Sequence, residues 1–249
     1  HYNSSRTGVR LTGPQPEWAR EDGGEAGLHP SNIHDNAYAF GSIDFTGDMP
    51  VILGPDGPSL GGFVCPGVVI NADRWKLGQL TPGDKIHFVP VSEADAATLT
   101  QATERWIAQL GNRPSLSPTT PVRSPFVTGG PWPDKDSDVV IRRAGQEWLL
   151  VEFGPHTLDI GLRLRAHAFG SRIKAAGFGG IVEMTAGIRS LQIRYDTNQW
   201  DAEKLARALG PLLDDVRTLD NEIIESRIVH LPLSWDDPAC REAVSRYVQ

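Results

Sequence analysis

The chain has 249 residues, 39% of them hydrophobic, which suffices for one large or two ordinary domains with real cores. Its formal net charge is −7, and no run of lysines and arginines offers a footprint for a nucleic acid partner. The polar start and the lack of an apolar run of about eighteen residues argue against a signal peptide and a membrane span. Cys65 and Cys240 lie far apart, so we expect free thiols in a reduced, cytoplasmic setting rather than a disulfide scaffold.

Residues 1–110 have the pattern of a β-rich domain. Short apolar runs at 51–53, 68–70 and 86–89 alternate with Gly-Pro, Asp-Gly and Pro-Gly-Asp turns, which predicts the strands of a barrel. An apolar face with helical spacing then follows Ser92, a good N-cap residue. We therefore expect a β-barrel portion with a trailing helix.

The segment 111–137 is expected to be an extended linker, because its repeated prolines cannot sustain a helix or a central strand. Beyond it, the apolar periodicity predicts the order ββαββαβ. An antiparallel sheet with both helices on one face, an α+β sandwich, accounts for that order. The expected elements are a hairpin over 139–153, a helix from Asp159 to Ala176, strands at 181–185 and 191–195, a helix from Asp201 to Val216 and a strand at 228–231.

The segment 22–36 is the strongest candidate for a functional site. It combines glycines, carboxylates, imidazoles and amides with almost no apolar side chains to bury. Glycine permits backbone turns at positive φ, and polar groups on irregular backbone beside a scaffold are typical of binding loops. We expect residues 23–35 to be exposed irregular backbone whose polar side chains converge on one cleft.

Four further motifs accompany this segment: Asn3–Pro14, Gly41–Pro66, Leu77–Asp84 and His230–Pro238. Together with it they resemble the carboxyltransferase region of urea carboxylase (urea amidolyase). The resembled protein is a biotin enzyme that carboxylates urea to allophanate and belongs to a cyclophilin-like superfamily with allophanate hydrolase subunit 1/2-like proteins. The run His29-Pro30-Ser31-Asn32-Ile33-His34-Asp35 favours the urea branch. Only the stretch 112–138 has no recognised motif.

The resemblance implies a fold and a domain division. A cyclophilin-like β-barrel portion would be followed by a small α/β subdomain and the start of another barrel, with the catalytic cleft between barrels. The chain reads as a piece of a longer protein, so we expect it to be inactive in isolation. The expected parts are 1–110 as the barrel portion, 111–137 as the linker, 138–233 as the α+β subdomain and 234–249 as the start of a following barrel.

The chemistry of the resembled enzyme assigns roles to particular side chains. Hydrogen-bond donors must meet the charge that develops on the ureido oxygen of carboxybiotin, and Ser31, Asn32 and His34 carry such donors. Acceptors such as Asp35 or Asp44 would orient the N–H groups of urea. We assign His29, Asn32, His34 and Asp35 to catalysis and Ser31 and Asp44 to substrate binding.

Motifs for the other steps of such an enzyme are absent from the sequence. Met49 and Met184 have no adjacent lysine for biotin attachment, and there is no nucleotide-binding glycine loop or amidase signature. The resemblance therefore implies that biotin is carried on a separate carboxyl carrier domain and that ATP is used by a biotin carboxylase domain. Allophanate hydrolase is the third expected partner.

Other interpretations stay open. His29, His34 and Asp35 offer zinc ligands, although their spacing is not that of a helical pair. Asn32, Asp35 and Asp48 can fix turns through their own side chains. The remaining alternatives concern function: guanidine in place of urea, a non-catalytic binding module of the kinase-inhibitor type, or a 5-oxoprolinase-like subunit.

Three further features have ordinary structural explanations. Gly61-Gly62 is expected in a strand bulge rather than a phosphate loop, because no Gly-Lys-Ser/Thr follows. Cys65 is expected to be a small buried residue rather than a nucleophile. Asp236-Asp237-Pro238 is expected to start a turn or cap a final short helix.

Overall fold

The structure, a computed structural model, describes all residues except 1, 22, 24–26, 113, 116, 118, 120, 129–137, 220–225, 235 and 249. The chain divides into two compact units, His1–Leu219 and Asp220–Gln249. Part of the polar segment at 22–36, most of the proline-rich end of the expected linker, and Trp235 therefore lie outside the described residues.

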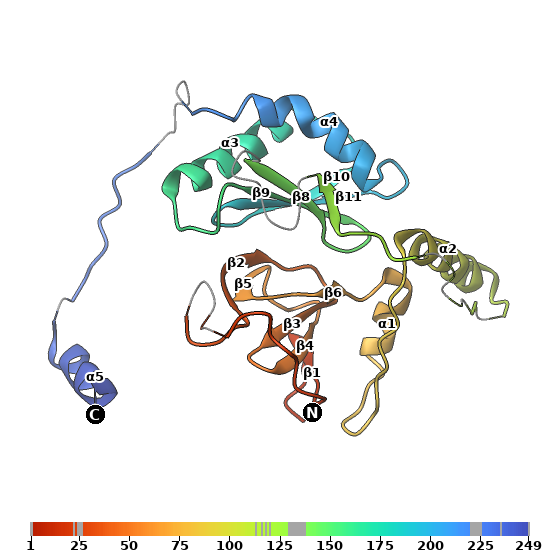
Figure 1. Cartoon of the computed structure of the whole chain (residues 1–249), viewed down its shortest axis with the longest axis horizontal. Coiled ribbons are helices and arrows are strands. Elements are labelled where there is room, and N and C mark those ends of the chain that lie inside the picture. Colours follow the sequence, from red (N-terminus) through yellow and green to blue (C-terminus); the bar gives the residue numbers. More distant parts are fainter. Residues whose placement is uncertain are drawn as a thin grey trace. The chain divides into compact units, whose positions relative to one another are not determined.

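The first part of the larger unit is built from short antiparallel strands (Figure 1). A four-stranded sheet has the order β1-β4-β3-β6, and β2 and β5 form a separate two-stranded sheet. Within the described residues these strands do not close into a barrel. The strands are β1 (Gly8–Arg10), β2 (Asn32–Ala37), β3 (Ser42–Thr46), β4 (Met49–Leu53), β5 (Leu60–Phe63) and β6 (Gly67–Val68).

Strand β2 corrects the expectation that residues 23–35 are irregular and exposed. Asn32 pairs with Phe63 and Asn36 with Gly61 of β5. A Cβ at Gly61 would lie 2.3 Å from the ring of Tyr38, so glycine is what lets β5 approach this strand. The polar composition of β2 does not predict a strand, because its strand structure depends on pairing with β5, which lies further along the chain. Gly61-Gly62 does lie in a strand, as expected.

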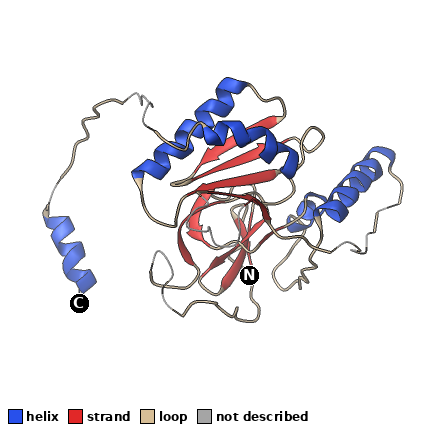
Figure 2. Cartoon of the chain, turned by 45° about the horizontal axis from the view of Figure 1, so that its top comes forward, coloured by secondary structure: helices blue, strands red, loops and turns tan. Residues whose placement is uncertain are grey.

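The second part of the larger unit is a five-stranded antiparallel sheet of order β10-β11-β9-β8-β7 with two helices over one face (Figure 2). The hairpin, both later strands and both helices are confirmed close to the expected bounds. These elements are β7 (Phe126–Thr128), β8 (Val139–Arg143), β9 (Trp148–Phe153), α3 (Ile160–Ala176), β10 (Ile181–Ala186), β11 (Ser190–Tyr195) and α4 (Ala202–Asp214).

Local sequence sets the ends of these helices. Asp159 accepts hydrogen bonds from the amides of Gly161 and Leu162 at the start of α3, and Gly177 ends α3 at φ 65°. Asp201 accepts from the amide of Lys204 at the start of α4. The apolar stripes of both helices then meet the sheet in one core. Its fully buried large side chains include Phe153, Phe169, Ile193, Leu205 and Leu209.

The expected order ββαββαβ is wrong at both ends. Phe126–Thr128, inside the expected linker, forms β7 against β8, because its three residues reach a free sheet edge that the sequence does not reveal. At the other end, residues 226–234 contain no strand. Ile228 is 87% exposed and Leu231 79%, so this apolar run has no partner strand within the described part of the chain.

The run 86–89 is a similar correction. It forms no strand, and Phe88 is 47% and Val89 54% exposed. Before it lie a short 3-10 helix, η1 (Asn71–Asp73), and helix α1 (Arg74–Leu77), and after it comes helix α2 (Glu93–Gln109). The start of α2 is as expected, since the hydroxyl of Ser92 accepts from the amide of Asp95.

The smaller unit contains helix α5 (Pro238–Val248). Its start confirms the expected capping role of this segment: a carboxylate oxygen of Asp237 accepts from the amide of Cys240 at 2.9 Å. Asp236 pairs with Arg241 at 2.7 Å. Among all helices in the described ranges, none is both long and apolar enough to cross a membrane.

Candidate active site

A buried polar layer lies on the face of the five-stranded sheet opposite the helices. All six residues of strand β9 are buried, so both faces of the sheet are covered at this strand. Leu149, Val151 and Phe153 point into the core beneath the helices. Trp148, Leu150 and Glu152 alternate with them and therefore lie on the opposite face. Register places Ser190 opposite Glu152 and Gln192 opposite Leu150 on that same second face. This face therefore carries polar side chains that are nevertheless withdrawn from water.

Asp35 connects the polar layer to the first part of the chain. One of its carboxylate oxygens accepts from the backbone amide of Ile188 at 2.8 Å and from the hydroxyl of Ser190 at 3.3 Å. A Cβ at Gly187 would lie 2.2 Å from the same oxygen. Strand β2 and the β10–β11 turn are thus fitted closely around one carboxylate.

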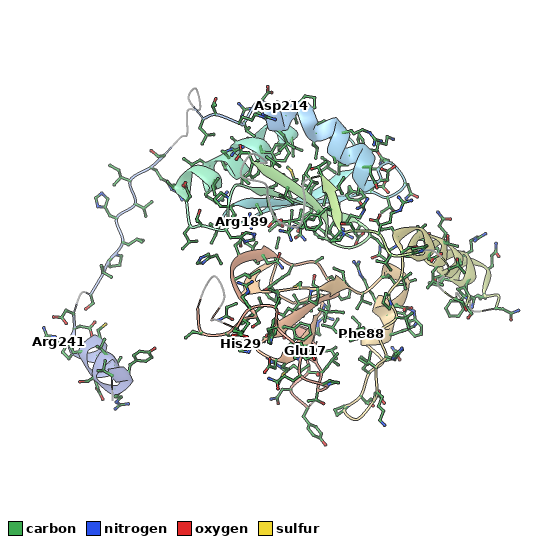
Figure 3. The ribbon with its side chains drawn as sticks, viewed as in Figure 1. Glu17, His29, Phe88, Arg189, Asp214 and Arg241 are labelled. Atoms are coloured by element: carbon green, nitrogen blue, oxygen red, sulfur yellow. The ribbon has the colours of Figure 1, made fainter. Side chains whose placement is uncertain are left out.

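Three charged residues extend the layer beyond Asp35. The carboxylate of Glu152 pairs with Arg189 at 2.8 Å and with Arg142, and Arg189 also contacts the imidazole of His156 at 2.8 Å. Figure 3 shows Arg189 on the side of the helix-covered sheet that faces the first group of strands. Glu152 and Arg189 are both buried, which makes a charge-paired centre of low solvent access.

His29 and Ser31 form a second group, at the turn before β2. The ring of His29 lies between two partners: its Nδ1 is 2.9 Å from the Ser31 hydroxyl and its Nε2 is 3.4 Å from a carboxylate oxygen of Asp48. The Ser31 amide also donates to Nδ1 at 3.1 Å, so Nδ1 is the acceptor nitrogen. Asp48, His29 and Ser31 thus place a carboxylate, an imidazole and a hydroxyl in line. Ser31 is 0% exposed, so its hydroxyl is closed off from solvent.

Asp48 fixes that line in place. It accepts from the indole of Trp18 at 2.8 Å and from the amide of Gln15 at 2.6 Å, and the Trp18 ring packs edge-on against His29. These hydrogen bonds, the Trp18 bond first, hold the pKa of Asp48 below its ordinary value. The Asp48 carboxylate is therefore charged at neutral pH and orients the imidazole.

Asn32 and His34 differ in what they contact. The amide of Asn32 donates to the carbonyl of Gly27 at 2.7 Å and so closes the same turn that holds His29. His34 lies two residues further along β2 and is half-buried. The structure thus brings His29, Ser31 and Asn32 together, and it places Asp35 against a different set of partners.

Asp44 lies in a third environment, within β3. It is 5% exposed, and its carboxylate accepts from the Thr46 hydroxyl at 3.3 Å. Burial raises the pKa of Asp44, and the charge of Asp44 in turn contributes to the raised pKa values of Tyr38 and Cys65. Burial is the main cause for Cys65, whose pKa is about 12, so this thiol is a poor nucleophile, as expected.

A large groove of the unit lies elsewhere. It has a volume of about 1980 Å³ and runs along β3 and β4 toward residues 83–91, with Phe45, Trp75 and Phe88 among its lining residues. None of the six predicted site residues lines it. Figure 3 labels Phe88, which lines this groove, and His29, which does not.

Sequence reasoning missed Ser190, Arg189, Glu152 and the Trp18–Asp48 pair. Asp35 and Ser190 are 155 residues apart, and no local motif joins β2 to β11. For zinc, the described residues contain no group of three or more histidines, cysteines and acids arranged to hold a metal ion.

Comparison with known proteins assigns the chain to a family. The family model described as carboxyltransferase domain, subdomain A and B, matches residues 1–90, and that for subdomain C and D matches residues 139–245. Urea amidolyase of Lachancea kluyveri is 42% identical over 99% of this chain. The chain spans only 14% of the length of that relative.

Two solved structures are similar over the same range. The crystal structure of Kluyveromyces lactis urea amidolyase has a TM-score of 0.84 and 42% identity, covering 99% of this chain and 15% of its own. That of the Kluyveromyces lactis urea carboxylase has a TM-score of 0.82 and 41% identity, covering 99% of this chain and 22% of its own. The chain therefore belongs to the carboxyltransferase family of urea carboxylase and urea amidolyase.

Proposed function

We propose that this chain is part of the carboxyltransferase of a biotin-dependent urea carboxylase, which transfers the carboxyl group of carboxybiotin to urea to form allophanate, or to a relative such as guanidine to form the corresponding carboxylated product. The observation that carries the proposal is the similarity to urea amidolyase over 99% of the chain. The buried polar layer supports it, because acyl transfer needs fixed donors and acceptors in a site of low dielectric.

The two groups of side chains suit different tasks. The turn of His29, Ser31 and Asn32 is closed by its own hydrogen bonds, so its donors are held in place before a ligand arrives. Both hydrogen bonds that position Asp35 against the β10–β11 turn and β11 go to the same carboxylate oxygen, Oδ2. We assign proton acceptance from the acceptor nitrogen to Asp35 and orientation of the reacting groups to the turn and to His34, with Asp44 as a buried support behind β3.

The chemistry of the donor set matches what the biotin ring needs. Within the described residues, two buried side chains on this face of the sheet have polar atoms without a hydrogen-bond partner, the indole nitrogen of Trp148 and the amide of Gln192. Such donors could hold the ureido oxygen, where negative charge grows as the carboxyl group leaves. Carboxybiotin would supply that carboxyl group; the protein's part is to hold the ring, exclude water and move one proton.

The remaining parts of the reaction belong to partners. We propose that a biotin carboxyl carrier domain delivers the cofactor, that a biotin carboxylase domain uses ATP to load it, and that allophanate hydrolase consumes the product. The β-rich first part would be a portion of a cyclophilin-like barrel and the second an α+β sandwich. Two free thiols are consistent with a cytoplasmic enzyme.

The test uses the full-length enzyme that contains this chain. Asn32→Ala should lower urea-dependent turnover at least tenfold and leave the biotin-dependent ATPase of the carboxylase domain intact, because the substitution opens the turn that holds His29. The matched control is Asn198→Ala, since Asn198 makes a similar bond to Asp196 on an exposed turn. Unchanged urea turnover in Asn32→Ala would refute the assignment of this turn, and an enzyme without any urea-dependent turnover would refute the proposed function.

A further inference from the structure

The side chain of Gln192 lies in the polar layer, and its amide makes no hydrogen bond to any residue that the structure describes. It is 1% exposed, and neither its amide nitrogen nor its amide oxygen has a hydrogen-bond partner within the described residues. Its neighbours along β11 are paired: Ser190 bonds to Asp35 and Arg194 to Glu147. A buried amide that leaves two donor and two acceptor positions unused is costly, typically about 1–3 kcal/mol per group.

Trp148 adds a second unused donor on the same face. Its indole nitrogen is buried and unpartnered in the part of the chain that the structure describes, and the guanidinium of Arg194 stacks 5.7 Å above its ring. Arg194 pairs in register with Trp148, and Gln192 with Leu150, so Trp148 and Gln192 are diagonal neighbours. Diagonal residues on adjacent strands are about 7–8 Å apart, which aromatic and long side chains can span.

The unused groups define a chemical pattern of two donors, the indole N–H and the amide NH₂, beside one acceptor, the amide oxygen. A ureido group presents the complement, a carbonyl oxygen with two lone pairs next to an N–H. A guanidinium carries donors only, so it would leave both protein donors unpaired. Sites built around a particular hydrogen-bond pattern discriminate strongly against ligands that lack it.

We propose that Gln192 and Trp148 recognise a ureido group, the chemistry that urea and the ring of biotin share. The inference rests on the proposed function and adds the chemical group that is bound. It also makes Gln192 and Trp148 the residues that select urea over guanidine. The amide of Gln192 binds the ureido C=O and N–H side by side, and the Trp148 indole donates to the same carbonyl oxygen.

The test measures ligand binding to the 249-residue chain directly. The indole N–H resonances in nitrogen-15 NMR spectra report the binding. Urea and biotin are titrated separately at low millimolar concentration, with guanidinium chloride and sodium chloride for comparison. The Trp148 resonance, assigned with Trp148→Phe, should shift saturably with urea or biotin and not with guanidinium. The ligand that saturates at the lower concentration identifies the source of the ureido group.

Variants test the two residues. Trp148→Phe, read from backbone amide shifts, should weaken binding about three- to tenfold, and Gln192→Met should weaken it by at least as much, as expected for neutral hydrogen bonds. Trp106→Phe and Gln101→Leu on α2 are the matched controls and should bind as the parent does. Gln192→Met should also keep or raise the melting temperature, because it removes an unpaired buried amide.

Two results would overturn the inference. One is a Trp148 shift that grows linearly with urea and equals that of Trp106, which is a solvent effect. The other is a lowered melting temperature of Gln192→Met with unchanged binding, which means that the amide is paired inside the protein. Binding is measured here without turnover, so the two proposals can fail separately. If the chain binds the ligand saturably but the full-length enzyme does not carboxylate urea, this inference stands and only the proposed function is refuted.

Discussion

Removal of the Asp35 carboxylate should loosen the attachment of β2 to the β10–β11 turn. Asp35→Ala deletes the acceptor for the Ile188 amide at 2.8 Å and for the Ser190 hydroxyl at 3.3 Å. Hydrogen bonds to a charged group contribute about 1.5–3 kcal/mol, and the second bond is long, so we expect a loss of about 2–4 kcal/mol. In a unit of this size that lowers the melting temperature by roughly 5–15 °C.

The assay is thermal unfolding of the 249-residue chain, followed by circular dichroism. Asp214→Ala is the matched control, because Asp214 is exposed in an ion pair with Arg217 and its loss should shift the melting temperature by less than about 2 °C. Asp35→Asn, which keeps an acceptor oxygen without the charge, should fall between the parent and Asp35→Ala.

A double-mutant cycle tests the geometry itself. In the parent, a Cβ at Gly187 would lie 2.2 Å from the Asp35 oxygen and 2.4 Å from the Ser190 hydroxyl, so Gly187→Ala should destabilise strongly. In the Asp35→Ala background one of these two collisions is gone, and the added cost should be smaller. Effects that add within about 0.5 kcal/mol, or an Asp35→Ala chain as stable as the control, would refute the contact.

Two further predictions concern titrating groups. Burial raises the folded-state pKa of Asp44, so the folded state holds its proton longer, and stability from this group falls as pH rises from about 4 through the folded pKa. Asp44→Asn should therefore unfold at a higher temperature than the parent at pH 7 and lose that advantage near pH 3. The control is Asp215→Asn, because Asp215 is exposed. An equal gain at both pH values, or the same response from the control, would contradict burial of the charged carboxylate as the cause. Iodoacetamide at pH 8 should label Cys240 well before Cys65, because burial raises the pKa of Cys65 to about 12 and Cys240 is exposed. Mass spectrometry of the digested chain gives the order of labelling. Faster labelling of Cys65 would show that its thiol is accessible and ionised.

The sequence by itself determined the helices and the hairpin of the second part. Asp159 and Gly177 mark the ends of α3, and Asp201 the start of α4, through side-chain caps and a positive-φ glycine that act within a few residues. The motif at 29–35 also pointed to the family, which the comparisons then showed. These features are local, so a single segment contains all the information they need.

Only the tertiary structure decided which strands pair and which polar groups meet. The apolar runs at 86–89 and 228–231 read as strands and are not, whereas the polar run of β2 and the short β7 are strands, because pairing depends on a free edge elsewhere in the chain. Five of the six predicted site residues, all except His34, divide among three environments for the same reason. Asp35 meets Ser190 across 155 residues, and an unpaired amide such as that of Gln192 can be recognised only when all its neighbours in space are known.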